Sequence, residues 1–318
     1  MQIAMVGLGR MGGNMARRLL RAGHEVIAHD VDPDAVGSLA ADGALGAASL
    51  QEVVDRLDAP RAVWVMLPSG PITETAVSSL IGLLEPGDTV IDGGNANFHD
   101  SQARGATASA AGLDFLDVGV SGGVWGLDNG YGLMVGGADT AVARLQPVFD
   151  SLAPPGGFVH AGPSGAGHYT KMVHNGIEYG LMQAYGEGFA LLAAAPELGM
   201  DQAKLAGIAE AWRHGTVVRS WLLDLAALAL ADAEGFAGVR GHVADSGEGR
   251  WTVLEAVNRG VPVPVISASL FERFGSRDPD LFSNRMLAAL RNQFGGHAVE
   301  RAAVPPSAQP GETAAGVA

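Results

Sequence analysis

The sequence predicts an α/β protein in which an N-terminal, doubly wound parallel sheet is followed by a second, all-α domain. Three observations support this fold class. Short apolar runs typical of strands alternate with helical stretches in the first half of the chain, which is the pattern of βαβ units. A glycine-rich turn separates the first strand from the first helix. No strand pattern follows residue 167.

The first elements carry the clearest patterns. Residues 2–6 form an apolar run that ends at Gly7, and residues 25–29 form a second strand that ends at Asp30. Between them, apolar residues of the segment 11–22 recur every three to four positions, which predicts a helix. Further strands are predicted at 62–67, 89–92, 115–118 and 132–135. This order of elements is typical of a Rossmann-type sheet.

The segment 153–167 is rich in proline and glycine, so we expect the boundary between two domains there. We predict a dinucleotide-binding domain over 1–167, an all-helical substrate and oligomerisation domain over 168–301, and a disordered tail over 302–318. The helical domain begins with one long helix over 168–195, which ends before a proline. Further helices are predicted at 201–214, 216–234, 248–259, 265–274 and 279–294.

The composition excludes several classes of function. The 318 residues include 46 glycines and no cysteine, so disulfides, thiolate zinc sites and a cysteine nucleophile are excluded and a reducing compartment is expected. The net charge of −14 makes nucleic acid and anionic membranes poor partners. The sequence has no apolar run of about 18 residues that would span a membrane and no signal-peptide pattern at its start. We therefore expect a cytoplasmic protein.

A dinucleotide-binding turn is predicted between the first strand and the first helix. The G-x-G-x-x-G spacing is met by Gly7-Leu8-Gly9-Arg10-Met11-Gly12, in which the glycines permit a tight turn, close approach of a pyrophosphate and packing of helix on strand. The N-terminus of the helix then faces the anion. Asp30 follows Gly12 by 18 residues and can accept hydrogen bonds from ribose hydroxyls, whereas it would repel a 2′-phosphate. The predicted cofactor is therefore NAD rather than NADP.

A stripe of polar side chains is predicted on the helix 168–195. Its members recur at i, i+3, i+4, i+7 and i+8, which places them on one face: Lys171, His174, Asn175, Glu178 and Tyr179. The intervening positions suit packing, since they are apolar: Met172, Val173, Ile177 and Leu181. A solvated outer face is the alternative interpretation of this stripe.

Two features favour a site over a solvated face. The stripe directly follows the domain boundary, where clefts occur. Gly176 and Gly180 lie within the helix, where each costs about 1 kcal/mol relative to alanine. That cost is understandable where another backbone or a flat ring packs against the helix.

Two polar turns follow predicted strands and contribute to the same site. Asn95 ends an Asp-Gly-Gly-Asn turn after the strand 89–92, and Ser121-Gly122-Gly123 follows the strand 115–118. In open parallel sheets, ligands bind outside the carboxyl ends of the strands. Consecutive glycine N–H groups can hold a carboxylate there, and Ser121 adds a hydroxyl. Alone, the Ser-Gly-Gly segment would be an ordinary turn.

Together these motifs resemble those of a known family. The chain is similar to decarboxylating 6-phosphogluconate dehydrogenase, of the β-hydroxy-acid dehydrogenase superfamily, in the segments GLGRMG, IDGGN (91–95), GVSGG (119–123), GAGHYTKMVHNGIEYG (165–180) and RNQFGGH (291–297). The resemblance runs from Met1 to about His297, and the length matches the short form of the family. It implies NAD-dependent oxidative decarboxylation of 6-phospho-D-gluconate to D-ribulose 5-phosphate, CO2 and NADH, a step of the pentose phosphate pathway.

The resemblance also implies catalytic roles at matching positions. Lys171 would be the general base that removes the C3 hydroxyl proton and, once protonated, stabilises the enolate. Glu178 would be the acid that protonates C1. Asn175 and Ser121 would orient the substrate. Further substrate contacts would come from Asn95, Gly122, Gly123, His174 and Tyr179, and further cofactor contacts from Leu67, Pro68, Ser69 and Asn95. No metal is expected, because a lysine cation can polarise the keto group.

The phosphate of the substrate is implied to contact Arg273, Arg291 and His297, and an arginine fork suits phosphate. In larger relatives the tail arginine and histidine reach the neighbouring subunit. The resemblance therefore implies a homo-oligomer, a dimer or tetramer, whose C-terminal residues complete the neighbouring site. In the long form, the loop that matches 246–248 carries a lysine and a threonine. Here it reads Ser246-Gly247-Glu248, which argues against tight phosphate binding there unless Ser246 or Arg250 compensates.

Two other functions remain open at this point. A dehydrogenase of another β-hydroxy acid, similar to 3-hydroxyisobutyrate dehydrogenase, would keep Lys171 and Asn175 without needing three phosphate ligands. A non-catalytic NAD-binding sensor would need the glycine turn but not the stripe from Lys171 to Glu178.

Overall fold

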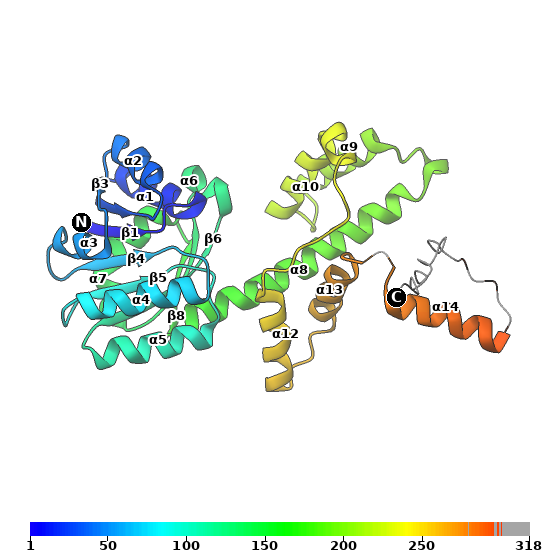
Figure 1. Ribbon diagram of the computed structural model, residues 1–318. Coiled ribbons are helices and arrows are strands. Elements are labelled where there is room, and N and C mark those ends of the chain that lie inside the picture. The colour runs from blue at the N-terminus through cyan, green and yellow to red at the C-terminus, as the bar shows by residue number, and fades with distance from the viewer. Residues whose placement is uncertain (279, 296–297, 299, 301–318) are drawn as a thin grey trace, which may run out of the picture. The chain divides into compact units, whose positions relative to one another are not determined.

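The computed structural model describes residues 1–278, 280–295, 298 and 300. Its N-terminal part forms one sheet with the strand order β3-β2-β1-β4-β5-β6-β7-β8 (Figure 1). The strands are β1 (Gln2–Val6), β2 (Glu25–His29), β3 (Leu45–Gly46), β4 (Ala62–Val65), β5 (Thr89–Asp92), β6 (Asp114–Ser121), β7 (Gly132–Gly136) and β8 (Phe158–Gly162). Every neighbouring pair is parallel except β6 and β7. The predicted α/β class with a Rossmann-type sheet is confirmed.

Helices cover both faces of the sheet because side chains alternate along each strand. Ile3 and Met5 of β1 belong to one core, with α1 (Arg10–Arg21), α2 (Pro33–Ala41) and α7 (Asp139–Leu152). Ala4 and Val6 belong to a second core, with α3 (Leu50–Asp55), α4 (Pro71–Leu83) and α5 (Phe98–Ala110). In Figure 1, α1 and α2 lie on one side of the strands and α4 and α5 on the other. Strands buried on both faces read as continuous apolar runs, as β1 and β4 do.

Three details of the sheet differ from the prediction. β7 runs antiparallel to β6, because the chain between them holds a short 3₁₀ turn (Gly123–Trp125) and one turn of α6 (Gly126–Asn129) rather than a full crossover helix. β8 lies inside the segment 153–167, which was predicted as a boundary without strands. The two-residue β3 was not predicted, since two residues give no periodicity.

Helices follow the sheet, as predicted. The first is α8 (Ala166–Ala193), 28 residues long, preceded by Gly165 in the left-handed region at φ 94°. The remaining helices are the 3₁₀ turn Pro196–Leu198, α9 (Gln202–Arg213), α10 (Trp221–Ala231), α11 (Ala233–Ala237), α12 (Glu248–Arg259), α13 (Pro264–Gly275) and α14 (Phe282–Gly295). The predicted helix 216–234 is divided, because Asp232 ends α10 and caps α11 through Gly235 N. No helix in the described part of the chain is long and apolar enough to cross a membrane.

The chain forms two compact units. The first comprises Met1–Val239 and Asp245–Leu270, so it holds the sheet together with α8, α9, α10 and α12. The second comprises Arg240–Ala244 and the chain from Phe271 onward. Within it, Arg273 donates to the carbonyl oxygen of Ala244 at 3.0 Å. The boundary at 167/168 stays a prediction, and the predicted tail 302–318 lies outside the described residues.

Candidate active site

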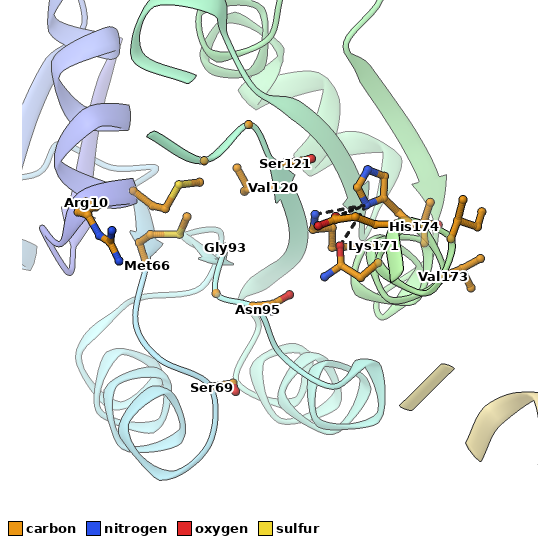
Figure 2. Close-up of a pocket in the computed structure, with 18 of the residues that line it drawn as sticks. Arg10, Met66, Ser69, Gly93, Asn95, Val120, Ser121, Lys171, Val173 and His174 are labelled. Carbon is orange, nitrogen blue, oxygen red and sulfur yellow. Dashed lines mark hydrogen bonds and ion pairs between the residues drawn. The ribbon is translucent and has the colours of Figure 1, made fainter. Parts of the chain in front are cut away.

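A cavity of about 1240 Å³ lies within the first unit, along the carboxyl ends of four parallel strands. Its walls come from the turn after β1, the segments after β4 and β5, and the end of β6: residues 9–12, 66–69, 93–95 and 120–123. α8 and the first turns of α10 close the remaining side. Figure 2 shows Arg10 and Met66 on one side of this pocket and Lys171 and His174 on the other. The strand order reverses direction between β1 and β4, which is where such sheets bind ligands.

The glycine turn is built to receive a phosphate group. Gly7 has φ +95°, and a Cβ on it would lie 2.4 Å from the carbonyl oxygen of Met66. A Cβ on Gly12 would lie 1.9 Å from the carbonyl oxygen of Gly7. At Gly9, by contrast, a Cβ would meet no described atom within 4 Å, so this backbone is open to a ligand. No described side chain caps the N-terminus of α1, and its N–H groups therefore face the cavity free to bind an anion.

Asp30 stands behind this turn rather than in the cavity wall. Its carboxylate accepts a hydrogen bond from Leu8 N at 2.6 Å and one from Asp32 N at 2.9 Å. The carboxylate is thereby fixed at the end of β2, with lone pairs left for ribose hydroxyls. Gly7 and Leu8 also lie outside the lining, whereas these predicted cofactor residues line it: Gly9, Arg10, Met11, Gly12, Leu67, Pro68, Ser69 and Asn95. The residues present fit a dinucleotide.

Four of the five stripe residues line the cavity: Lys171, His174, Asn175 and Glu178. His174 Nδ1 lies 3.5 Å from Lys171 Nζ, 3.1 Å from Asn175 Oδ1 and 3.8 Å from Glu178 Oε2. Figure 2 shows Lys171 and His174 beside one another, joined by a dashed line. An amine, an amide and a carboxyl group therefore face one cavity from a single helix.

Tyr179, the fifth residue of the stripe, does not line this cavity, and its contact with the substrate stays a prediction. It is buried, and a Cβ on Gly249 of α12 would lie 2.4 Å from its ring, so it packs against that helix. The reason is angular, since eight residues at 100° each turn Tyr179 by about 80° from Lys171. Val173, Ile177 and Leu181, predicted to pack, instead line the cavity, and Ile177 is 53% exposed. The cavity face is thus rotated toward these apolar residues.

Lys171 is buried, with 9% of its surface exposed, although it lines the cavity. Burial lowers the pKa of Lys171, while the nearby carboxylates of Glu178 and Glu248 oppose that shift. A Cβ on Gly119 would lie 2.3 Å from the Lys171 Cβ, so β6 packs directly on the stem of the lysine. A lowered pKa is what a lysine needs to act as a general base, because it makes the neutral amine easier to reach.

Glu248 is a neighbour of the site whose burial the sequence did not reveal. It is the first residue of α12 and is 1% exposed. Ser246 Oγ donates to its Oε2 at 2.7 Å, while Oε1 has no hydrogen-bond partner among the described residues. Arg250 forms an ion pair with Asp245. Ser246 and Arg250 thus each contact a carboxylate of their own segment, and a phosphate contact by either residue stays a prediction.

The turns after β5 and β6 present the remaining predicted residues. Asn95, Ser121, Gly122 and Gly123 all line the cavity. The turn before Asn95 is held by the buried Asp92, which accepts from Gly94 N at 3.1 Å and from Arg104 at 2.9 Å. The walls formed by α10 were not predicted, because nothing in their apolar sequence marks them: Ser220, Trp221, Leu222 and Leu225.

The predicted phosphate residues are not in this lining. Arg273 and Arg291 belong to the second unit, on α13 and α14. His297 lies outside the described residues. Within the described ranges, no cluster of three or more histidine or carboxylate side chains is arranged to hold a metal ion.

The chain is similar to known proteins over most of its length. Residues 2–162 match the family model "NAD binding domain of 6-phosphogluconate dehydrogenase", and residues 167–284 match "6-phosphogluconate dehydrogenase, C-terminal domain". An NAD(+)-dependent, decarboxylating 6-phosphogluconate dehydrogenase of Haloferax volcanii is 47% identical over 95% of this chain and 99% of its own. One of the same description from Bacillus subtilis is 32% identical, over 86% of this chain and 60% of its own.

Solved structures are also similar to this chain over most of its length. The 6-phosphogluconate dehydrogenase of Plasmodium falciparum superposes with a TM-score of 0.80 at 26% identity, covering 97% of this chain and 67% of that one. The 3-hydroxyisobutyrate dehydrogenase of Salmonella typhimurium gives 0.70 at 26% identity, covering 85% of this chain and 91% of that one.

Proposed function

Because this chain belongs to the 6-phosphogluconate dehydrogenase family, we propose that it catalyses NAD-dependent oxidative decarboxylation of 6-phospho-D-gluconate to D-ribulose 5-phosphate, CO2 and NADH. The family membership expected from the motifs is confirmed. The observation that carries the proposal is the placement of a desolvated amine, Lys171, and a carboxyl group, Glu178, on one wall of a cavity that also contains the glycine turn.

The side chains support a sequence of proton transfers. Neutral Lys171 accepts the proton of the C3 hydroxyl as C3 is oxidised. Bound NAD supplies the hydride acceptor. Once protonated, Lys171 donates a hydrogen bond to the C3 oxygen and stabilises the enolate that forms as CO2 leaves. Glu178 then donates a proton to C1 of the enediol. His174, within 4 Å of both groups, is positioned to hold the lysine and the carboxyl group toward the same substrate.

The polar turns support orientation of the substrate. Ser121 and Asn175 lie on different walls of the cavity, on β6 and α8, so together they define the direction of a bound sugar acid. The N–H groups of Gly122 and Gly123 suit its carboxylate. We assign the phosphate to Arg273, Arg291 and His297, in agreement with the motif match.

We also propose a homo-oligomer, a dimer or tetramer, in which Arg291 and His297 complete the site of a neighbouring subunit. Exposed apolar side chains on α12 and α13 support a protein partner: Leu254, Val257 and Val265. The cysteine-free composition supports a cytoplasmic location.

A panel of substrates and cofactors tests the activity. Purified protein is supplied with 6-phosphogluconate, gluconate or 3-hydroxyisobutyrate, each with NAD or NADP, while NADH and CO2 are followed together. We expect equal amounts of NADH and CO2 from 6-phosphogluconate with NAD. Formation of NADH without CO2, or faster turnover of an unphosphorylated acid, would contradict the proposal. Either result would favour a dehydrogenase similar to 3-hydroxyisobutyrate dehydrogenase. That enzyme is the second candidate because the Salmonella structure is similar and because a carboxylate stands at position 248.

A further inference from the structure

We propose that Asp117 is a positioning residue for this reaction, because its carboxylate fastens the N-terminus of α8, which carries Lys171, to β6, which carries Ser121. The inference rests on the proposed function, since it concerns the spacing of two groups that act on one substrate. Asp117 itself does not line the cavity. It acts through the two elements that it joins.

The carboxylate of Asp117 is fully buried and is shared between two backbone amides. Its Oδ1 accepts from Gly165 N at 2.6 Å, and its Oδ2 accepts from His168 N at 2.8 Å. Both amides belong to the start of α8, where the first N–H groups have no partners within the helix. The helix brings no acidic residue to its own first turn and no side-chain cap among the described residues. Asp117 supplies both functions from a neighbouring strand.

The charge of Asp117 has no other counterpart in the described structure. Asp92, the comparable buried aspartate on β5, pairs with Arg104 at 2.9 Å. Asp117 forms no ion pair with any described residue, so the two amides and the positive end of the α8 dipole are what offset its charge. A 28-residue helix provides that dipole. The attraction therefore acts between β6 and α8 specifically.

Close packing makes this attachment rigid. A Cβ on Gly167 would lie 2.3 Å from the carbonyl oxygen of Asp117 and 2.5 Å from that of Met134. One turn further along, the stem of Lys171 rests on Gly119, where a Cβ would lie 2.3 Å from the lysine Cβ. The backbone of α8 thus meets the backbone of β6 directly at Gly167, and at Gly119 the stem of Lys171 is the side chain that separates the two elements. This packing leaves little room for α8 to shift along β6.

The consequence is a fixed distance between two groups of the active site. Ser121 lies four residues beyond Asp117 on β6, and Lys171 lies one helical turn beyond His168 on α8. Both line the same cavity. Because reacting groups must be held within a fraction of an ångström, a displacement of about 1 Å costs on the order of 100-fold in rate. Loosening the attachment at Asp117 therefore lowers turnover without touching the dinucleotide turn.

The variant Asp117→Asn removes the negative charge. Its side-chain NH2 group then faces the backbone N–H group of Gly165 or His168, so one of the two hydrogen bonds is lost. Asp88→Asn is the matched control. Asp88 is likewise buried, and it accepts from Arg61 N at 2.6 Å and Glu85 N at 3.0 Å. It differs from Asp117 in also forming an ion pair with the Arg61 side chain at 3.1 Å, and it lies before β5, at the opposite end of the strand from the cavity. Both variants lose backbone hydrogen bonds in the sheet domain. Asp117→Asn alone releases α8.

The measurements are kcat per NADH-binding site, KM for 6-phosphogluconate, Kd for NADH, and hydrogen exchange of the amides of residues 165–171. For Asp117→Asn we expect kcat to fall at least 10-fold, Kd to stay within twofold, and exchange at 165–171 to become faster. For Asp88→Asn we expect kcat within twofold and unchanged exchange there. If Asp117→Asn yields no folded protein, Asp117→Glu, which keeps the charge but lengthens the side chain, is expected to show the same loss of kcat.

Two results would overturn the inference: a kcat within twofold of wild type in a folded Asp117 variant, or an equal loss in Asp88→Asn. An Asp117→Glu chain that also fails to fold while Asp88→Asn folds normally would count against it too, since the residue would then be required for folding rather than positioning. Failure of the proposed function is distinguishable, because the wild-type protein would then not produce CO2 from 6-phosphogluconate. The exchange measurement does not depend on activity.

Discussion

Replacing Lys171 by methionine separates the chemistry of this residue from its packing. Methionine matches the length of the lysine stem and can fill the same space against Gly119 and the cavity wall. It removes the amine, the group that accepts the C3 hydroxyl proton. The dinucleotide turn at Gly9 lies on another wall and is unchanged. We therefore expect Lys171→Met to bind NAD normally and to lose most of its turnover.

The size of the loss follows from what else is available in the cavity. Among the described residues that line it, the basic nitrogens belong to Arg10, Lys171 and His174. An arginine cannot act as a base, so His174 and water are the remaining acceptors. Positioned acid–base groups contribute typically about 10²–10⁴-fold, which corresponds to roughly 3–5 kcal/mol in the activation barrier. We expect kcat to fall within that range.

The same substitution makes a prediction about stability. Burial lowers the pKa of Lys171 below its ordinary value of 10.5, so the folded protein is less stable when this lysine must be charged. In the pH range between the lowered folded pKa and the unfolded pKa, the unfolded chain binds more protons, and the stability of the wild type rises with pH. Lys171→Met removes this contribution. Its unfolding free energy at neutral pH is therefore expected to equal or exceed that of the wild type.

The assay combines turnover, binding and unfolding on the same preparations. Steady-state NADH formation gives kcat, fluorescence titration gives the Kd for NADH, and urea denaturation at pH 7 and pH 9 gives the stability. A variant with near-normal kcat would remove Lys171 from the mechanism. A variant that is clearly less stable than wild type at pH 7 would refute the argument that the charged lysine is held at a cost.

Three further predictions concern residues around the same cavity. Glu248→Gln removes a carboxylate that raises the pKa of Lys171, while Glu178 and His174 stay in place. The pKa of Lys171 is then lower, so we expect the acidic limb of the kcat/KM profile to move to lower pH. A move to higher pH would contradict this. Gly119→Ala places a Cβ 2.3 Å from the Lys171 Cβ, and we expect kcat to fall more than about 10-fold with NADH affinity within twofold, as titration and kinetics can check. Asp30→Ala frees the amide of Leu8, and we expect the KM for NAD to rise by about 10-fold while the preference for NAD over NADP falls; an unchanged cofactor ratio would remove Asp30 from specificity.

Local patterns were sufficient for the parts of the fold that depend on short stretches of chain. The apolar runs predicted the positions of β1, β2 and β5 correctly. A strand that is buried on both faces is apolar at consecutive positions, and this run is visible in the sequence. The direction of β7 depends on the length of chain that separates it from β6. A short connection gives an antiparallel pair, and the composition of β7 itself does not show this. β8 was not predicted, because its short apolar run lies among prolines and glycines.

The active site divides in the same way. The glycine turn and the four polar residues of α8 that share one wall could be predicted from local spacing, because both depend on one or two turns of backbone. Three other features are visible only in the folded chain: Tyr179 packs against α12, Glu248 is buried at the start of that helix, and Asp117 fastens α8 to the sheet. These contacts join residues about 50 to 80 positions apart, and no periodicity in a single chain records which distant backbone will lie against another.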